Sequence, residues 1–466
     1  MQSTRFETNP EVTAKPPKLH EIGISALVAL LSFAVVVLYA SIGRPIWLDE
    51  LFQFAFGGFR STGSAWHAIR HSIAGINFGQ TGIYMLLDYW LLKVFGANSF
   101  ALRLPSILSA GLMLWGGLTF LWQRRFRAVW QFVLIVCYIG QAFLMYFAGE
   151  ARAYMPLAGA SVGVFTYYQL TPAERRSRSV MVLGWVSILW GASINPYFAF
   201  YWLSLFTFGY LTAVAEERTR FSLKAALAHV NAPLSIVGVA IYFGIGAVTW
   251  IVNLRRIGLD PFQLLSKDKM YETFVDGCHF QFLGKLGTSW IILTVAVYFV
   301  HICLNSQARR FSRPLLPPCL LLWLAMLLSL YVSYESYLHD YWILPRQWVA
   351  SAALIPIAFV WLCAELVNLI GRVWAVGARL IPSLCLCLIA AHAYPRVLNQ
   401  GHALLLAFKS KSPSQKFVPP PREALARTGS GVDEQTFYNT WVALANKNVE
   451  AGGPVSPVFQ FFYQNF

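Results

Sequence analysis

The sequence predicts an all-α polytopic membrane protein, and three observations carry this prediction. The chain has 466 residues, of which 57% are hydrophobic and only 12% are charged, whereas soluble domains carry about 25% charged residues. Apolar runs close to the ~20 residues needed to cross a bilayer recur along most of its length. The basic residues, which give a net charge of +15, form short clusters between these runs, as the positive-inside rule describes. Clusters dispersed in this way argue against nucleic-acid binding, which needs one continuous basic patch.

The predicted elements follow from the apolar runs and the basic clusters. Residues 1–20 are polar and contain three prolines, so we interpret them as a cytoplasmic tail. The next run is too long for a signal-peptide core and is expected to remain as a span. Placing every basic cluster on the cytoplasmic side gives about eleven membrane-spanning helices. Their predicted ranges are 22–43, 103–122, 128–148, 153–170, 180–194, 196–214, 231–252, 287–305, 314–333, 346–369 and 380–395.

The remaining segments are assigned to the outer side or to its interface. Residues 84–95 are apolar, but they are few and include two charged side chains, so we expect a helix lying at the outer membrane surface. The transmembrane domain is predicted over 21–395. It has external loops at 44–102, 253–286 and 334–345, and a small external segment follows at 396–466.

Metal-binding patterns are weak in this sequence. His67 and His71 are four residues apart, but no third ligand accompanies them, so no metal site is predicted. The seven cysteines form neither CxxC pairs nor a placement that indicates an external disulfide.

Two adjacent carboxylates, Asp49 and Glu50, come directly after the first predicted span. Such a pair at a membrane surface suits a general base and a hydrogen-bonding partner for a substrate hydroxyl. The alternative is that both carboxylates end the span and are solvated.

A second group, Glu150, Arg152 and Tyr154, falls where the third predicted span ends and the fourth begins. Charges two residues apart do not share a helix face, so an irregular turn is expected. The planar guanidinium of Arg152 matches phosphate oxygens. Arg346 follows a proline at the outer end of the tenth predicted span. The alternative for both arginines is an interfacial position against lipid head groups.

These elements resemble the GT-C glycosyltransferases that use polyprenyl-phosphate sugars, in particular the protein O-mannosyltransferases and lipid A aminoarabinose transferases. Residues 95–106 read F-G-A-N-S-F-A-L-R-L-P-S, similar to that family's F-G-x-x-x-x-A-x-R-L-P-S phrase. Residues 150–154 read E-A-R-A-Y, and Pro345-Arg346 resembles a late Pro-Arg element of the family. The segment 79–84 reads G-Q-T-G-I-Y; it keeps the family's tyrosine but lacks its basic residue and prolines.

The resemblance implies a GT-C fold and an inverting transfer to a lipid, glycan or protein acceptor on the non-cytoplasmic face. It assigns the general base to Asp49, orientation of the acceptor or of Asp49 to Glu50, and the lipid phosphate to Arg152 and Arg346. We expect Glu150, Tyr154, Tyr84 and Gln80 to contact substrate as well. No cofactor is required, although some relatives use a divalent cation. The implied location is a bacterial inner membrane, with the site facing the periplasm.

Two other function classes remain open from the sequence. A flippase or transporter of lipid-linked oligosaccharides places ionisable groups near the middle of the bilayer and often has inverted repeats. Here the candidate charges lie at the ends of spans, and no repeat is visible. A polysaccharide ligase or polymerase shares lipid-linked substrates and external loops.

Overall fold

A computed structural model describes the central part of the chain. The described residues are 82–96, 99–247 except 196 and 217, 313–338 and 348–371, with scattered positions in 27–66 and 296–304. The predicted tail 1–20, the loop 253–286, the span 380–395 and the segment 396–466 lie outside the described residues, so they stay predictions.

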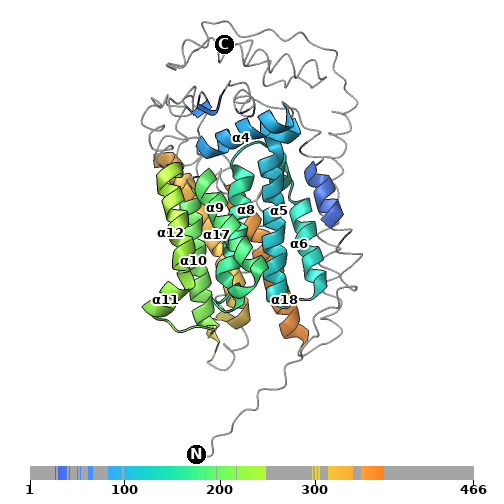
Figure 1. Ribbon diagram of the computed structural model, residues 1–466. Coiled ribbons are helices and arrows are strands. Elements are labelled where there is room, and N and C mark those ends of the chain that lie inside the picture. The colour runs from blue at the N-terminus through green and yellow to red at the C-terminus, as the bar shows by residue number, and fades with distance from the viewer. Residues whose placement is uncertain are drawn as a thin grey trace, which may run out of the picture.

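Within the described residues the fold is a helical bundle without strands (Figure 1). The helices in chain order are α4 (Gly82–Phe95), α5 (Ser99–Gln123), α6 (Ala128–Gly140), α7 (Ala142–Ala148), α8 (Tyr154–Gln169), α9 (Arg178–Ile194), α10 (Phe198–Ala215), α11 (Leu223–Val230), α12 (Ala232–Ile241), α17 (Leu316–Leu338) and α18 (Val349–Gly371). Shorter helical turns are η2 (Glu174–Arg176), η3 (Tyr242–Ala247, a π-helix) and η4 (Arg313–Leu315).

Three of the described helices are long and apolar enough to cross a membrane. They are α5, α10 and α18, which coincide with the predicted spans 103–122, 196–214 and 346–369. The bent pair formed by α11 and α12 would count as a fourth. The bundle is therefore that of an integral membrane protein, and the full count of eleven spans stays a prediction.

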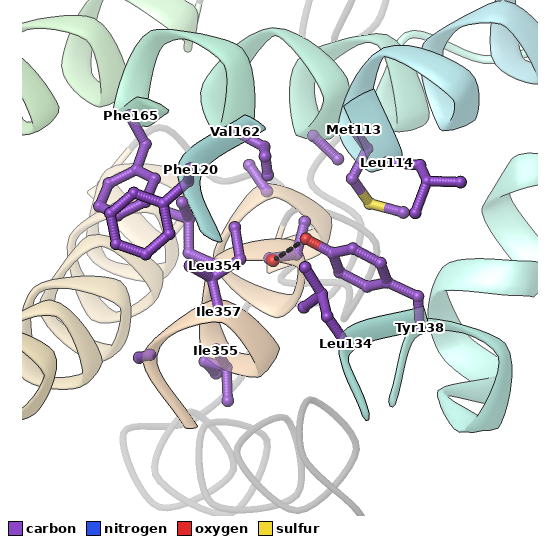
Figure 2. Packing of buried hydrophobic residues seen from close by; sticks show 14 of the residues in the cluster. Met113, Leu114, Phe120, Leu134, Tyr138, Val162, Phe165, Leu354, Ile355 and Ile357 are labelled. Atoms are coloured by element: carbon purple, nitrogen blue, oxygen red, sulfur yellow. Dashed lines mark hydrogen bonds between the residues drawn. The ribbon is translucent and has the colours of Figure 1, made fainter. Parts of the chain in front are cut away.

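The centre of the bundle is packed by aromatic and aliphatic side chains from α5, α6, α8 and α18 (Figure 2). The Phe120 ring lies 4.9 Å from the Phe165 ring and 5.0 Å from the Trp361 ring. The buried Tyr138 hydroxyl donates a hydrogen bond of 3.2 Å to the Ala353 carbonyl (Figure 2). Because these contacts join helices from both halves of the described chain, α18 is a central element of the bundle.

Several predicted boundaries are wrong. The predicted span 128–148 is interrupted at Gln141, which separates α6 from α7. Helix α5 begins at Ser99, inside the predicted external loop 44–102. Helix α17 continues to Leu338, into the predicted external loop 334–345. Apolar composition locates a helix but does not fix where its backbone hydrogen bonding ends.

The helix predicted at 84–95 is present as α4, which lies across one end of the bundle (Figure 1). Its position at the outer membrane surface stays a prediction. The same end holds the turn between α7 and α8 and the start of α5. The opposite end holds the described basic clusters, such as Arg124 and Arg125 after α5 and Arg175 and Arg176 in η2. The candidate site and these basic clusters therefore occupy opposite ends of the molecule, as the predicted orientation requires.

Candidate functional site

A buried ion pair between Glu50 and Arg103 organises the end of the bundle that carries the candidate residues. The Arg103 Nε and Nη2 atoms donate to Glu50 Oε1 and Oε2 at 2.9 and 2.6 Å, and both side chains are fully buried. Arg103 Nη1 also donates to the Ser41 carbonyl at 2.5 Å. The Ala151 backbone N–H donates to Glu50 Oε1 at 2.7 Å. A two-pronged arginine–carboxylate pair is both strong and directional, so it fixes four chain segments relative to one another.

The segment Gly149–Ala153 is the irregular turn that the sequence predicted, and its backbone is held from two sides. The Ser106 hydroxyl on α5 donates to the Glu150 carbonyl at 2.5 Å. The Asn195 amide, at the end of α9, donates to the Ala153 carbonyl at 3.4 Å. These bonds explain how five residues outside any helix keep a defined conformation.

The charged side chains of this turn lie at the edge of the packed interior. Glu150 is 1% exposed and Arg152 is 5% exposed. The Arg152 guanidinium carbon lies 5.9 Å from the centre of the Tyr154 ring, over its face. Such a contact helps to hold the cation in place. An arginine in this setting is suited to binding phosphate.

Helix α4 brings two further polar groups to the same place. Tyr84 packs in a small buried cluster with Ala153 and Ile194, which attaches α4 to the turn. Asp88 lies one helical turn later, and both residues are 0% exposed. Burial raises the pKa of Asp88 well above its usual value; the nearby Arg152 opposes this shift and Glu50 reinforces it.

Among the predicted site residues, the structure brings together Glu50, Glu150, Arg152, Tyr154 and Tyr84. Asp49, Gln80 and Arg346 lie outside the described residues, although Asp49 is the chain neighbour of Glu50. Arg346 precedes the buried Trp348 by two residues in the sequence.

The geometry changes the interpretation of Glu50 as a catalytic group. Both of its carboxylate oxygens bind Arg103, one of them also binds a backbone N–H, and no part of the side chain reaches solvent. A group held in this way suits positioning better than proton transfer with an acceptor. We therefore treat Glu50 as a positioning residue.

Sequence reasoning did not select Arg103, Ser106 and Asp88 as site residues. Two of them were visible as signals, because Arg103 and Asp88 are charged residues set in apolar runs. A charge in such a run is costly unless it has a partner or a function. Ser106 carried no comparable signal, since serine is common in membrane helices.

Two other features of the described residues do not compete with this site. No group of three or more His, Cys, Asp or Glu residues there is arranged to hold a metal ion. A groove of about 910 Å³ lies between α10 and α17 and includes Glu216, His301 and Arg313 in its lining. Glu216 follows the end of α10 that points away from the candidate site. The groove is otherwise mostly apolar.

Comparisons with known proteins gave matches in shape only. No protein-family model matches the sequence, and no curated protein matches it. ArnT from Cupriavidus metallidurans in the apo state matches over 92% of this chain and 77% of its own, with 13% identity and a TM-score of 0.46. ArnT of the same organism bound to undecaprenyl phosphate matches over 92% of this chain and 78% of its own, with 14% identity and a TM-score of 0.43. A likeness at these scores is one of general shape.

Proposed function

We propose that this chain is an inverting membrane glycosyltransferase of the GT-C type. It moves a sugar from a polyprenyl-phosphate donor to a lipid, glycan or protein acceptor at the non-cytoplasmic face of the membrane. The proposed location is a bacterial inner membrane, with the site facing the periplasm. The observation that carries the proposal is the buried Glu50–Arg103–Ala151 network. The network joins three of the segments that resemble the family: Asp49-Glu50, residues 95–106 and residues 150–154.

Two residues that adjoin the network along the chain have different proposed roles. Asp49 precedes Glu50 and Arg152 follows Ala151, so each is one peptide bond away from a group held by the network. Asp49 is the proposed general base and Arg152 is the proposed phosphate-binding cation. Fixing the backbone beside each reacting group provides the rigid support that catalytic geometry requires.

The proposed reaction balances in charge and protons. The acceptor hydroxyl gives its proton to the Asp49 carboxylate while its oxygen bonds to the anomeric carbon of the sugar. The bond between that carbon and the phosphate oxygen breaks, and the polyprenyl phosphate leaves with additional negative charge. Arg152, assisted by Arg346, stabilises this charge in a poorly hydrated setting, where preorganised cations are most effective.

The test is sugar transfer by purified protein in nanodiscs, given a panel of polyprenyl-phosphate sugars and an envelope extract as acceptor. Asp49→Asn preserves size but does not accept the proton, so transfer should fall by roughly 10²–10⁴-fold. Glu174→Gln is the matched control, because it makes the same chemical change at the opposite end and at a side chain that is 41% exposed.

A second pair of variants tests the phosphate contact. Arg152→Gln should weaken use of the donor by about tenfold or more, since charge-assisted hydrogen bonds are worth about 1.5–3 kcal/mol. Arg176→Gln, at an exposed position in η2, should have little effect. Normal transfer by folded Asp49→Asn protein would refute the assignment of Asp49 as the general base. Movement of lipid-linked sugar across sealed vesicles by a wild type that transfers nothing would favour a transporter.

A further inference from the structure

The inner face of α4 carries two polar side chains that the proposed reaction does not use. Asp88 and the Tyr84 hydroxyl are fully buried. Neither carboxylate oxygen of Asp88 makes a hydrogen bond, and neither does the Tyr84 hydroxyl. The two residues are four apart on one helix, so they lie on the same face, one above the other.

An unpaired polar pair in a water-excluded place is uncommon and requires an explanation. The Ser106 hydroxyl donates to the Glu150 carbonyl and lies close enough to Tyr84 to lower the pKa of its phenol. The Asp88 carboxyl is therefore the unpartnered group on which the inference of a ligand depends. Replacing both groups by apolar ones would remove the cost of burying them. Their presence beside Arg152 therefore indicates a ligand that completes these hydrogen bonds.

The electrostatic setting indicates what kind of ligand this is. Burial raises the pKa of Asp88 well above its usual value and also raises that of Tyr84, with Asp88 adding to the shift at Tyr84. A carboxyl group and a phenol one helical turn apart offer several hydrogen-bond acceptors together with the phenol donor. Such a pair matches hydroxyl groups, which both donate and accept, whereas a cationic ligand would meet the positive charge of Arg152.

We propose that Asp88 and Tyr84 form a subsite that binds hydroxyl groups of the transferred sugar, next to the phosphate held by Arg152. This inference rests on the proposed function, and it assigns the sugar-reading part of the site to α4. The donor is then divided between two elements: its phosphate faces the turn before α8, and its sugar faces the interfacial helix. Helix α4 lies across the end of the bundle that also carries the turn before α8 (Figure 1).

The experiment measures binding of two probes to the full-length protein in nanodiscs: polyprenyl phosphate alone, and polyprenyl phosphate carrying a neutral hexose. Asp88→Leu should weaken binding of the hexose lipid by about tenfold, as expected for a lost hydrogen bond of ordinary strength. It should change binding of the sugar-free lipid by less than about twofold. Asp88→Asn keeps one donor and one acceptor, so its loss should be smaller than that of Asp88→Leu.

Tyr84→Phe removes only a hydroxyl and decides the matter if Asp88→Leu does not fold. It should weaken binding of the hexose lipid and spare the sugar-free lipid. Trp90→Phe, at a half-exposed position on α4, is the control and should alter neither affinity.

Equal losses for both probes would overturn the subsite and leave the proposed function intact. A greater loss for Asp88→Asn than for Asp88→Leu would also overturn it, because hydrogen bonding by the side chain at this position would then not contribute to binding of the sugar. A wild type that binds neither lipid would refute the proposed function itself, and the subsite with it.

Discussion

Breaking the Glu50–Arg103 pair should destabilise the protein more than any exposed charge substitution. Glu50→Gln removes the carboxylate that pairs with the buried Arg103 cation, and Arg103→Leu removes the cation that pairs with the buried Glu50 carboxylate. Removing one partner of a buried pair costs about 3–5 kcal/mol. Each single variant should therefore lose about that much free energy of unfolding.

The double variant distinguishes the free-energy cost of leaving one charge unpaired from the cost of losing the hydrogen bonds to the backbone. In Glu50→Leu/Arg103→Leu both charges of the pair are removed, but the Ser41 carbonyl and the Ala151 N–H lose these partners. At about 1–3 kcal/mol for each unsatisfied group, the double variant should lose about 2–6 kcal/mol. That loss is smaller than the ~6–10 kcal/mol obtained by adding the two single variants, each at the cost of a broken buried pair.

The assay is denaturant titration of the purified protein in mixed micelles, followed by tryptophan fluorescence. The matched control is Glu174→Gln, which removes the partner of a half-exposed pair with Arg218 at 3.4 Å. Exposed pairs contribute at most about 1 kcal/mol. If both single variants at the buried pair fell within that range, Glu50 would not be held as we describe.

Three further predictions follow from the same structure. Gly159→Ala should destabilise the protein by about 1–3 kcal/mol, because its Cβ would collide with the α5 backbone; Gly111→Ala, where a Cβ meets nothing within 4 Å, should be neutral or stabilising. Because the pKa of Asp88 is raised, the contribution of this group to stability is fully present below the usual pKa of 3.8 and is lost as pH rises through the raised value. Asp88→Asn should abolish this loss, and identical pH–stability curves for the wild type and the variant would contradict it. Single cysteines at Ser61 and Ser177 should react with an impermeant thiol reagent from opposite sides of the membrane, and the one at Ser61 should react from the outside. Labelling of both from one side would contradict the predicted orientation.

Much of the helix order was predictable because the membrane makes one physical demand on every span. A helix that crosses lipid must be apolar over most of its length, and this signal located α5, α10 and α18. The break at Gln141 was not predictable, because a run of apolar residues reads the same whether its backbone is continuous or interrupted. The extension of α17 to Leu338 was missed for a related reason: its last residues include Ser333, Glu335 and Ser336, which resemble a loop.

The parts of the site that are formed by residues close together in the sequence were predictable. Glu150 and Arg152 are two residues apart, and that spacing alone indicated a turn. The pairing of Glu50 with Arg103 spans 53 residues, and nothing in a single sequence specifies which buried charges meet. The position of Arg103 nonetheless indicated that it has a partner, because a lone cation at the start of an apolar run needs one. The resemblance phrase included it without assigning it a role.

The buried network also favours Asp49 over Glu50 as the proposed general base. A general base exchanges a proton with the acceptor, so it needs a free oxygen within reach of a substrate hydroxyl. Both Glu50 oxygens face Arg103, and the side chain is sealed from solvent. Asp49 and Arg152 each adjoin a residue of this network along the chain, so loosening the network displaces the proposed base and the proposed phosphate-binding cation together. A displacement of about 1 Å in such a pair can cost 10²-fold in rate. Glu50→Gln protein that remains folded should therefore lose transfer activity while retaining the Asp49 carboxylate, and full activity of that variant would separate the network from the chemistry.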